Sequence, residues 1–344
     1  MVECRPLRFF VSTLDKDGYM AAEKIDLTLC VPGLSAIAKA GITMPLLQRM
    51  LSRAGKVKSA RGGEERLLFA LFDFSIPAKS PLPIAPLTYY LDCGEPATGA
   101  LLRADPVYCQ ASRNQVIMVA AGLDLSMDEA EQMVEELNGL FAEDGWCFTA
   151  ATPQRWYLRM PGAAQLQAEP LSQVLGKDIH QYLPRLEGAE TLHRSLTEIE
   201  MLLHANQANQ QRQMQQQLPV TNLWLWGGGE LPVPPVCDFV QVWSGDALAL
   251  ALAKYAGVPR TDAPEDAATW LQQQTTPGRH LLTLSSLENP LEFESQWMIP
   301  LAEALSSGRL NSLELQLGNG YGYRINKRSQ RRWWRRTKPL GTLL

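Results

Sequence analysis

The sequence predicts an α/β protein in two lobes, and three observations favour this class. At 344 residues the chain is longer than one compact core of ordinary size, which indicates two lobes or one large domain with an insertion. The stretch 220–235, VTNLWLWGGGELPVPP, places leucines on one strand face and tryptophans on the other, which is typical of a central strand. Asp246 then caps the helix ALALALAKYA, which Gly257 ends, and HLLTL (280–284) is a second buried strand. Strand, helix and strand in this order favour a parallel sheet.

Two helices in the first half carry start signals. One is expected at 44–54, with Thr43 as its cap and Pro45 in its first turn, whereas RGGEE (61–65) is typical of a turn. Ser126 and the glutamate three positions later form a capping box that predicts a second helix. Its buried stripe is Ala130, Met133, Val134, Leu137 and Phe141, with Gly145 beyond its end.

The second half continues with paired strands and a long helix. WCFTA (146–150) and RWYLRM (155–160) predict two strands. A helix is expected over 190–216, with an apolar stripe in its first half and a glutamine-rich, solvated second half. The alternating segment 312–317 meets 321–325 across Gly-Asn-Gly, which predicts an edge hairpin.

The composition is that of an ordinary globular protein. Apolar residues make up 46% and charged residues 20%, and the net charge is −4. We find no run of about 18 apolar residues and no signal peptide at the N-terminus, so we expect a cytoplasmic protein without a membrane partner. The six cysteines are scattered without a CxxC pair, which favours free thiols over a zinc site or a disulfide framework.

The last 21 residues are basic, and the rest of the chain is acidic. Basic residues interleaved with Trp333 and Trp334 could hold a nucleic-acid backbone and stack a base. The more ordinary alternative is that the tryptophans pack on the body while the arginines pair with its acidic residues. The segment has no acidic residue and eight basic ones, namely Arg324, Lys327, Arg328, Arg331, Arg332, Arg335, Arg336 and Lys338.

The block LLHANQANQQRQMQQQLPVTNLWLWGGGELPVPP resembles the archaeal-type cofactor-independent phosphoglycerate mutases. In that family a similar run ends a helix and enters an N-x-W-x-W-G-x-G strand. The capping-box helix and GKDIHQYLP (176–184) resemble the inserted domain of the family. The resemblance spans about 105–257. The matching positions of the strand motif are Asn222, Trp224, Trp226, Gly227 and Gly229.

This resemblance implies an alkaline-phosphatase-like fold, with a sheet core built from both chain ends and an inserted α+β domain. The predicted organisation is therefore an N-terminal part of the core at 1–104, the inserted domain at 105–217, the C-terminal part of the core at 218–323, and the basic tail at 324–344. The family transfers a phosphoryl group through a serine held against two divalent metals, which requires several Asp and His ligands.

The expected metal ligands are missing from the corresponding motifs. In place of D-G-x-x-D the N-terminal segment has Asp15, Asp17 and Gly18 in the wrong order, and in place of D-E-x-G-H the later segment has Glu288 and Asn289. Of the four histidines, two on the long helix are eleven residues apart, roughly 16 Å by helix rise, too far for one metal. We therefore assign no catalytic residue, no metal ligand and no cofactor. The histidines are His180, His193, His204 and His280.

The chain also resembles bacterial proteins labelled as regulatory proteins of the pathogenicity-factor (Rpf) type. The shared segments are ADPVY (104–108), PQRWYLR (153–159), LWLWGGG (223–229) and the WWRR tail. Arg155 and Arg159 share a strand face and could clamp a phosphate or carboxylate, or could simply be exposed.

The hypothesis that follows is a catalytically degenerate phosphoglycerate-mutase-like scaffold that binds a partner protein or ligand. The second resemblance adds a regulatory role to this hypothesis. The alternatives are an active metal-dependent phosphomutase or phosphohydrolase, and a nucleic-acid-associated protein that binds through its tail. The sequence does not determine an oligomeric state. The expected ligand cleft comprises Asn222, Trp224, Trp226, Gly227, Gly229, Arg155 and Arg159. The expected tail contacts are Arg331, Arg332, Trp333, Trp334, Arg335 and Arg336.

Overall fold

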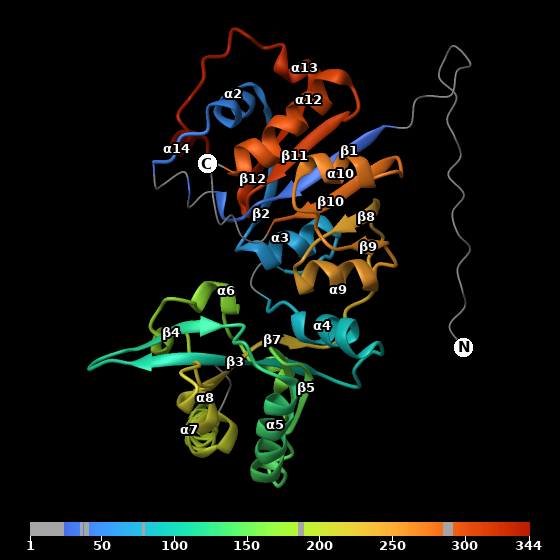
Figure 1. Cartoon of the computed structure of the whole chain (residues 1–344). Coiled ribbons are helices and arrows are strands. Elements are labelled where there is room, and N and C mark those ends of the chain that lie inside the picture. Colours follow the sequence, from blue (N-terminus) through green and yellow to red (C-terminus); the bar gives the residue numbers. More distant parts are fainter. Residues whose placement is uncertain (1–23, 35–36, 38–40, 78–79, 185–188, 285–291) are drawn as a thin grey trace, which may run out of the picture.

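A computed structural model describes the chain from residue 24 to 344, with gaps at 35–36, 38–40, 78–79, 185–188 and 285–291. Two sheets dominate it (Figure 1). The larger has seven strands in the order β2 (Gly55–Arg61), β12 (Asn319–Asn326), β11 (Ser312–Gln316), β1 (Ile25–Cys30), β10 (Gly278–Thr283), β8 (Phe239–Trp243) and β9 (Arg260–Thr261). Strands from both chain ends thus pair within one sheet, which confirms the predicted α/β core.

The seven-stranded sheet is parallel except at one side. Strands β11, β1, β10, β8 and β9 run parallel, while β12 is antiparallel to both β11 and β2. The predicted hairpin of β11 and β12 is therefore present, but its place at the sheet edge was wrong. Strand β2 pairs with the outer side of β12 through residues that include Gly55, Val57 and Lys58. The sequence pattern did not identify this segment as a strand.

The second sheet is formed by the middle of the chain. It contains β3 (Leu101–Ala111), β4 (Val116–Ala121), β5 (Cys147–Thr152), β6 (Arg155–Arg159) and β7 (Asn222–Gly229), all paired antiparallel. The expectation that β7 belongs to the parallel core was wrong, because it pairs with β3 from Leu101 to Val107. Burial on both faces made β7 look like a parallel strand, but here the second face is covered by α4 rather than by a crossover helix of its own sheet.

Helices cover both sheets (Figure 1). Helix α4 lies between them, while α5, α7 and α8 lie on the far side of the second sheet. Among the described residues, no helix is both long and apolar enough to span a bilayer. The α-helices are α2 (Pro45–Arg53), α3 (Glu64–Leu71), α4 (Ile84–Cys93), α5 (Met127–Phe141), α6 (Leu171–Val174), α7 (Ala189–Ala205), α8 (Gln207–Met214), α9 (Ala247–Tyr255), α10 (Ala267–Gln273), α12 (Ile299–Ser307), α13 (Lys327–Gln330) and α14 (Leu340–Leu343). Shorter turns are η1 (Ala163–Gln165), η2 (Ile179–Gln181) and the π-helical η3 (Phe293–Met298).

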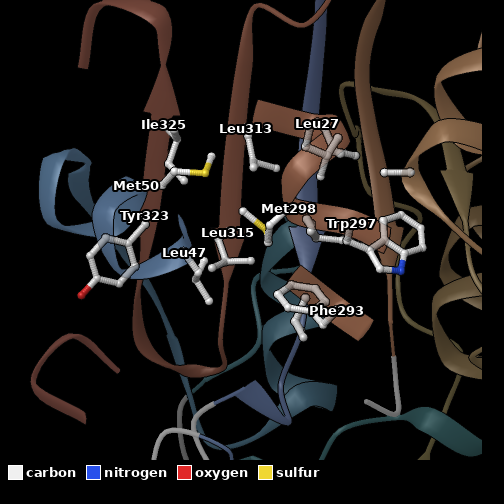
Figure 2. Packing of buried hydrophobic residues seen from close by; sticks show 14 of the residues in the cluster. Leu27, Leu47, Met50, Phe293, Trp297, Met298, Leu313, Leu315, Tyr323 and Ile325 are labelled. Atoms are coloured by element: carbon white, nitrogen blue, oxygen red, sulfur yellow. The ribbon is translucent and has the colours of Figure 1, made fainter. Parts of the chain in front are cut away.

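One face of the parallel sheet carries the largest core cluster (Figure 2). Leu27, Leu313 and Ile325 project from three neighbouring strands toward side chains of α2 and η3, such as Met50 and Trp297. Alternate residues of each strand point to this face, so the leucine-rich strands supply a continuous apolar layer. This layer holds α2 against strands that come from both ends of the chain.

The long helix predicted over 190–216 is broken at Asn206. Its side chain accepts from the backbone N–H of Asn209 at 3.2 Å and caps α8. Asn209 in turn donates to the carbonyls of Leu203 and Val220, both at 2.7 Å. Asparagine side chains compete with helical hydrogen bonds in this way, and two of them outweigh the helix-tolerant glutamines around them.

The capping box at the start of α5 is present as predicted. Ser126 Oγ accepts from the N–H of Glu129 at 3.2 Å, and Glu129 Oε2 accepts from the N–H of Ser126 at 2.7 Å. Ser126→Ala removes one of these bonds and is expected to lower the free energy of unfolding by about 1 kcal/mol, measured by urea denaturation. Ser306→Ala, in the exposed last turn of α12, is the control. Equal effects of the two changes would contradict the capping role.

Candidate functional site

A cavity of about 540 Å³ lies between the two sheets. Gly62 and Arg66 approach it from the β2–α3 connection, and Gln173 and Tyr182 approach it from the segment around α6 and η2. The end of β7 closes it with Trp226 and Gly227. Arg66 is held in place by the carbonyls of Pro77 and Ser80 at 3.1 and 2.7 Å. The cavity is therefore bordered by elements of both sheets, at the strand end that the sequence pattern singled out.

The three glycines at the end of β7 are required by close packing. A Cβ on Gly228 would lie 2.5 Å from the carbonyl oxygen of Ala163, closer than real Cβ contacts come. Gly227 has φ +64 and Gly229 has φ +154, conformations that residues with a side chain rarely adopt. The triple glycine thus lets β7 run against η1 and the start of α4, and Gly227 also lines the cavity.

A buried ion pair lies behind this wall. Arg103 of β3 donates through Nε and Nη2 to Asp105 Oδ1 at 2.9 and 2.7 Å. Trp226 Nε1 donates to Asp105 Oδ2 at 2.6 Å. Arg103 is 7% and Asp105 2% exposed, and the guanidinium lies 5.5 Å from the Trp226 ring centroid. The indole that borders the cavity is therefore fixed by a charged pair that is shielded from water.

The two arginines of the predicted clamp have separate surroundings. Arg155 donates to both carboxylate oxygens of Asp92, at 2.9 and 2.6 Å, and Tyr157 Oη donates to the same carboxylate at 2.6 Å. Burial, with a smaller contribution from the charge of Asp92, holds the pKa of Tyr157 above its usual value. Arg159 is exposed at the far end of β6. Arg155 thus forms its bidentate contact with a carboxylate of its own chain.

The remaining predicted cleft residues lie apart from this cavity. Trp224 Nε1 donates to the carbonyl of Glu169 at 3.0 Å, and Gly229 packs on Pro83. Asn222 instead borders a second cavity of about 260 Å³, together with His180 and His193. The structure therefore brings only Trp226 and Gly227 of the predicted set to the cavity between the sheets.

Polar side chains gather where the parallel strands end. Cys30 at the end of β1 is level with Thr283 at the end of β10. The hydroxyls of Thr283 and Ser244 share a hydrogen bond, and Asp246 caps α9 by accepting from Ala249 N–H at 2.8 Å. In open α/β sheets this edge is where ligands bind.

Two glutamates of α3 belong to the same edge. Burial raises the pKa of Glu64 to about 8, and the charges of Asp246 and Glu65 add to this effect. Glu65 Oε1 accepts from Ser172 at 2.6 Å, and burial also raises the pKa of this carboxyl. Glu64 and Asp246 contribute to the raised pKa of the Cys30 thiol, after burial. The sequence pattern predicted a turn at 61–65, and these glutamates were not recognised as part of a site. Two glycines followed by two acidic residues, between a strand and a helix, could have indicated one.

These side chains do not fit a site for two divalent metals. Such a site needs several carboxylates and imidazoles free to coordinate. Asp246 and Glu65 each have an oxygen engaged within the protein, and Ser244 and Thr283 bond to each other. In the part of the chain that the structure describes, no three His, Cys, Asp or Glu side chains form a group that could hold a metal. Asp15, Asp17, Gly18, Glu288 and Asn289 lie outside the described residues.

The one buried histidine has a structural environment. His280 lies in β10, with Nδ1 3.3 Å from Trp243 Nε1 and Nε2 2.7 Å from the carbonyl of Thr276. Burial lowers the pKa of His280, which favours the neutral ring. The ring can then accept from the indole and donate to the carbonyl. His180, His193 and His204 are exposed.

The tail does not have the arrangement in which its tryptophans pack on the body and its arginines pair with acidic residues. Trp333 is 79% and Trp334 64% exposed, so the expectation that they pack on the body was wrong. Arg332 Nη1 and Arg335 Nη1 donate to the carbonyls of Arg53 and Ala54 at 3.3 and 3.0 Å. These arginines bind the carboxyl end of α2, where helix carbonyls are unsatisfied, and therefore do not cover an acidic patch. Arg331 and Arg336 are exposed.

Comparison with known proteins gives partial matches. No family model matches the chain. It is 25% identical over 157 residues to the "Probable 2,3-bisphosphoglycerate-independent phosphoglycerate mutase" of Geobacter sulfurreducens, a match covering 45% of this chain and 38% of that protein. The chain therefore spans well under half the length of this curated relative.

Two solved structures align with most of the chain at low identity and low TM-score. A cofactor-independent phosphoglycerate mutase from Thermoplasma acidophilum is 14% identical, with a TM-score of 0.42, over 87% of this chain and 89% of that one. The PH0037 protein from Pyrococcus horikoshii is 11% identical, with a TM-score of 0.49, over 88% and 87% of the two chains.

Proposed function

We propose that this protein is a phosphoglycerate-mutase-like scaffold of the alkaline-phosphatase-like superfamily that has lost metal-dependent catalysis and acts by binding a ligand or partner protein. The observation that carries the proposal is the set of side chains at the carboxyl ends of the parallel strands. Cys30, Ser244 and Thr283 hold these positions, and the nearby Glu64 has a pKa of about 8. Hydroxyls that bond to each other, as those of Ser244 and Thr283 do, supply none of the carboxylate and imidazole ligands that two divalent cations require.

The scaffold part of the proposal draws on the 157-residue similarity to the probable mutase. It is also supported by a sheet that combines strands from both chain ends, while the strands between them in the sequence form a separate second sheet. A regulatory role is supported by the resemblance of the tail and the strand motifs to the Rpf-type proteins.

The binding part of the proposal rests on the cavity between the sheets. Its lining combines amides, such as those of Gln173 and Gln181, with the Trp226 ring, and Glu169 contributes to its wall. A volume of about 540 Å³ is in the range that small-molecule sites occupy. Because the wall of β7 is fixed by packed glycines and by a buried ion pair, the cavity is pre-formed, which lowers the cost of binding.

The test is the metal content and mutase activity of the purified full-length chain. We expect less than stoichiometric tight Mn²⁺ or Zn²⁺ by elemental analysis, and no conversion of 3-phosphoglycerate to 2-phosphoglycerate with added Mn²⁺. An active cofactor-independent mutase assayed beside it is the positive control. About two equivalents of bound metal together with turnover would refute the proposal and establish the active phosphomutase instead.

A further inference from the structure

Two segments that are far apart in the sequence form one basic surface. We use this name for residues 45–61, which comprise α2 and β2, together with residues 324–344. Gln330 accepts through its carbonyl from Arg53 Nη1 at 3.1 Å, and the backbone N–H of Lys338 donates to Ser52 Oγ at 2.9 Å. The chain after α13 arches over α2 and returns as α14 (Figure 1). The two segments are therefore held side by side by several specific bonds.

This surface concentrates the positive charge of the protein. The two segments hold 13 of the 32 basic residues and none of the 36 acidic ones, so the rest of the chain has 19 basic against 36 acidic residues. Carboxylates meet the surface at its margins, where Glu314 pairs with Arg324 and Glu294 accepts from the N–H of Leu46. The concentration of charge is not visible in the tail sequence alone, because residues 45–61 contribute five of the basic side chains. Arg49, Lys56, Lys58, Lys327, Arg328, Arg331 and Arg336 are exposed.

Two aromatic rings project from the same surface. The Trp333 and Trp334 rings are in edge contact, with centroids 6.1 Å apart and planes at 84°. The chain is anchored on both sides of the pair, since the side chains of Arg332 and Arg335 donate to carbonyls at the carboxyl end of α2. Exposing two indoles is costly in water, so a fixed and exposed pair indicates a surface that is covered by a ligand.

We propose that the basic surface binds single-stranded nucleic acid, with bases stacked on Trp333 and Trp334 and phosphates bound by the surrounding arginines and lysines. Aromatic rings within a positively charged surface are the usual means of holding unpaired strands. A membrane is less suitable, because Leu340 and Leu343 of the tail are buried and Leu344 packs against the same core cluster, which leaves no apolar helix face to insert. The proposal does not depend on the proposed function.

The experiment measures binding of the full-length chain to fluorescein-labelled (dT)15 and (U)15 by fluorescence anisotropy at 50 and 200 mM NaCl. Trp333→Ala/Trp334→Ala is expected to weaken binding about 20-fold or more, since each stacked base contributes about fivefold or more. Arg331→Ala/Arg336→Ala is expected to make the slope of log affinity against log salt shallower by about 1.4, since each phosphate contact contributes about 0.7.

Arg260→Ala, an exposed arginine in β9 at the opposite edge of the same sheet, is the matched control and is expected to bind as the unchanged protein does. All three variants change exposed side chains, so their melting temperatures should match that of the unchanged chain. The proposal is overturned if no binding occurs at 50 mM NaCl or if the tryptophan variant binds equally well. It is also overturned if phosphatidylserine vesicles or poly-glutamate bind more tightly than the oligonucleotides.

Discussion

Replacing Asp105 by alanine is expected to lower the free energy of unfolding by about 3–5 kcal/mol, measured by urea denaturation. The change leaves the Arg103 guanidinium, only 7% exposed, without its carboxylate partner. A buried charge that loses its partner pays the full cost of desolvation, which exceeds the cost of losing an ordinary hydrogen bond. The Trp226 indole N–H also loses its acceptor, so the wall of the cavity between the sheets should loosen at the same time.

Two control variants separate burial from charge in this prediction. Asp238→Ala removes a partner of similar chemistry from Arg279, but the Asp238 side chain is 67% exposed, so a loss of at most about 1 kcal/mol is expected. Arg103→Met/Asp105→Leu replaces both charges with apolar side chains and leaves only the Trp226 N–H without its acceptor, so it should cost clearly less than Asp105→Ala alone. If Asp105→Ala and Asp238→Ala were equally mild, the buried pair would contribute no more than a surface pair does.

The sequence predicted those features of the fold that depend on neighbouring residues. The capping box at Ser126 and the helix capped by Asp246 each need only a few adjacent positions, and both are present. The sheet that contains β7 could not be predicted in this way. Its partner β3 lies more than 100 residues earlier, and burial on both faces is compatible with either sheet.

The candidate site was predicted less completely, for a similar reason. Trp226 and Gly227 were found because they form a distinctive motif, and both border the cavity. Glu64 was missed because its significance comes from burial and from the charge of Asp246, which is 182 positions away and belongs to another element. Only the tail half of the basic surface was predicted, because its composition is evident in the sequence. The contact of the tail with α2 is a tertiary feature that the sequence does not reveal.

The stability of this protein is expected to fall as the pH rises from about 4.5 to 8, with Glu64 as a major cause. Within the part of the chain that the structure describes, Glu64 Oε1 is buried without a hydrogen-bond partner, and the pKa of this carboxyl is raised from 4.5 to about 8. Because the pKa in the folded state is the higher one, the contribution of Glu64 is fully present below pH 4.5 and is lost as the pH rises through 8. Each pKa unit corresponds to about 1.4 kcal/mol, so the change across this interval is about 4–5 kcal/mol.

Glu64→Gln tests this assignment, because the amide is uncharged throughout the range. The difference in unfolding free energy between the variant and the unchanged protein, measured in urea at pH 5 and pH 9, should shift by several kcal/mol in favour of the variant at pH 9. Taking the difference in unfolding free energy between the two proteins at each pH cancels the titration of Glu65 and Asp246 to first order. The coupling of these two carboxyls to Glu64 adds to the change in that difference between pH 5 and pH 9. Glu136→Gln, on the exposed face of α5, controls for the chemical change itself. A Glu64→Gln difference that is constant between pH 5 and pH 9 would mean that Glu64 is ionised in the folded protein, and the edge of the parallel sheet would then hold a permanent negative charge suited to a cation.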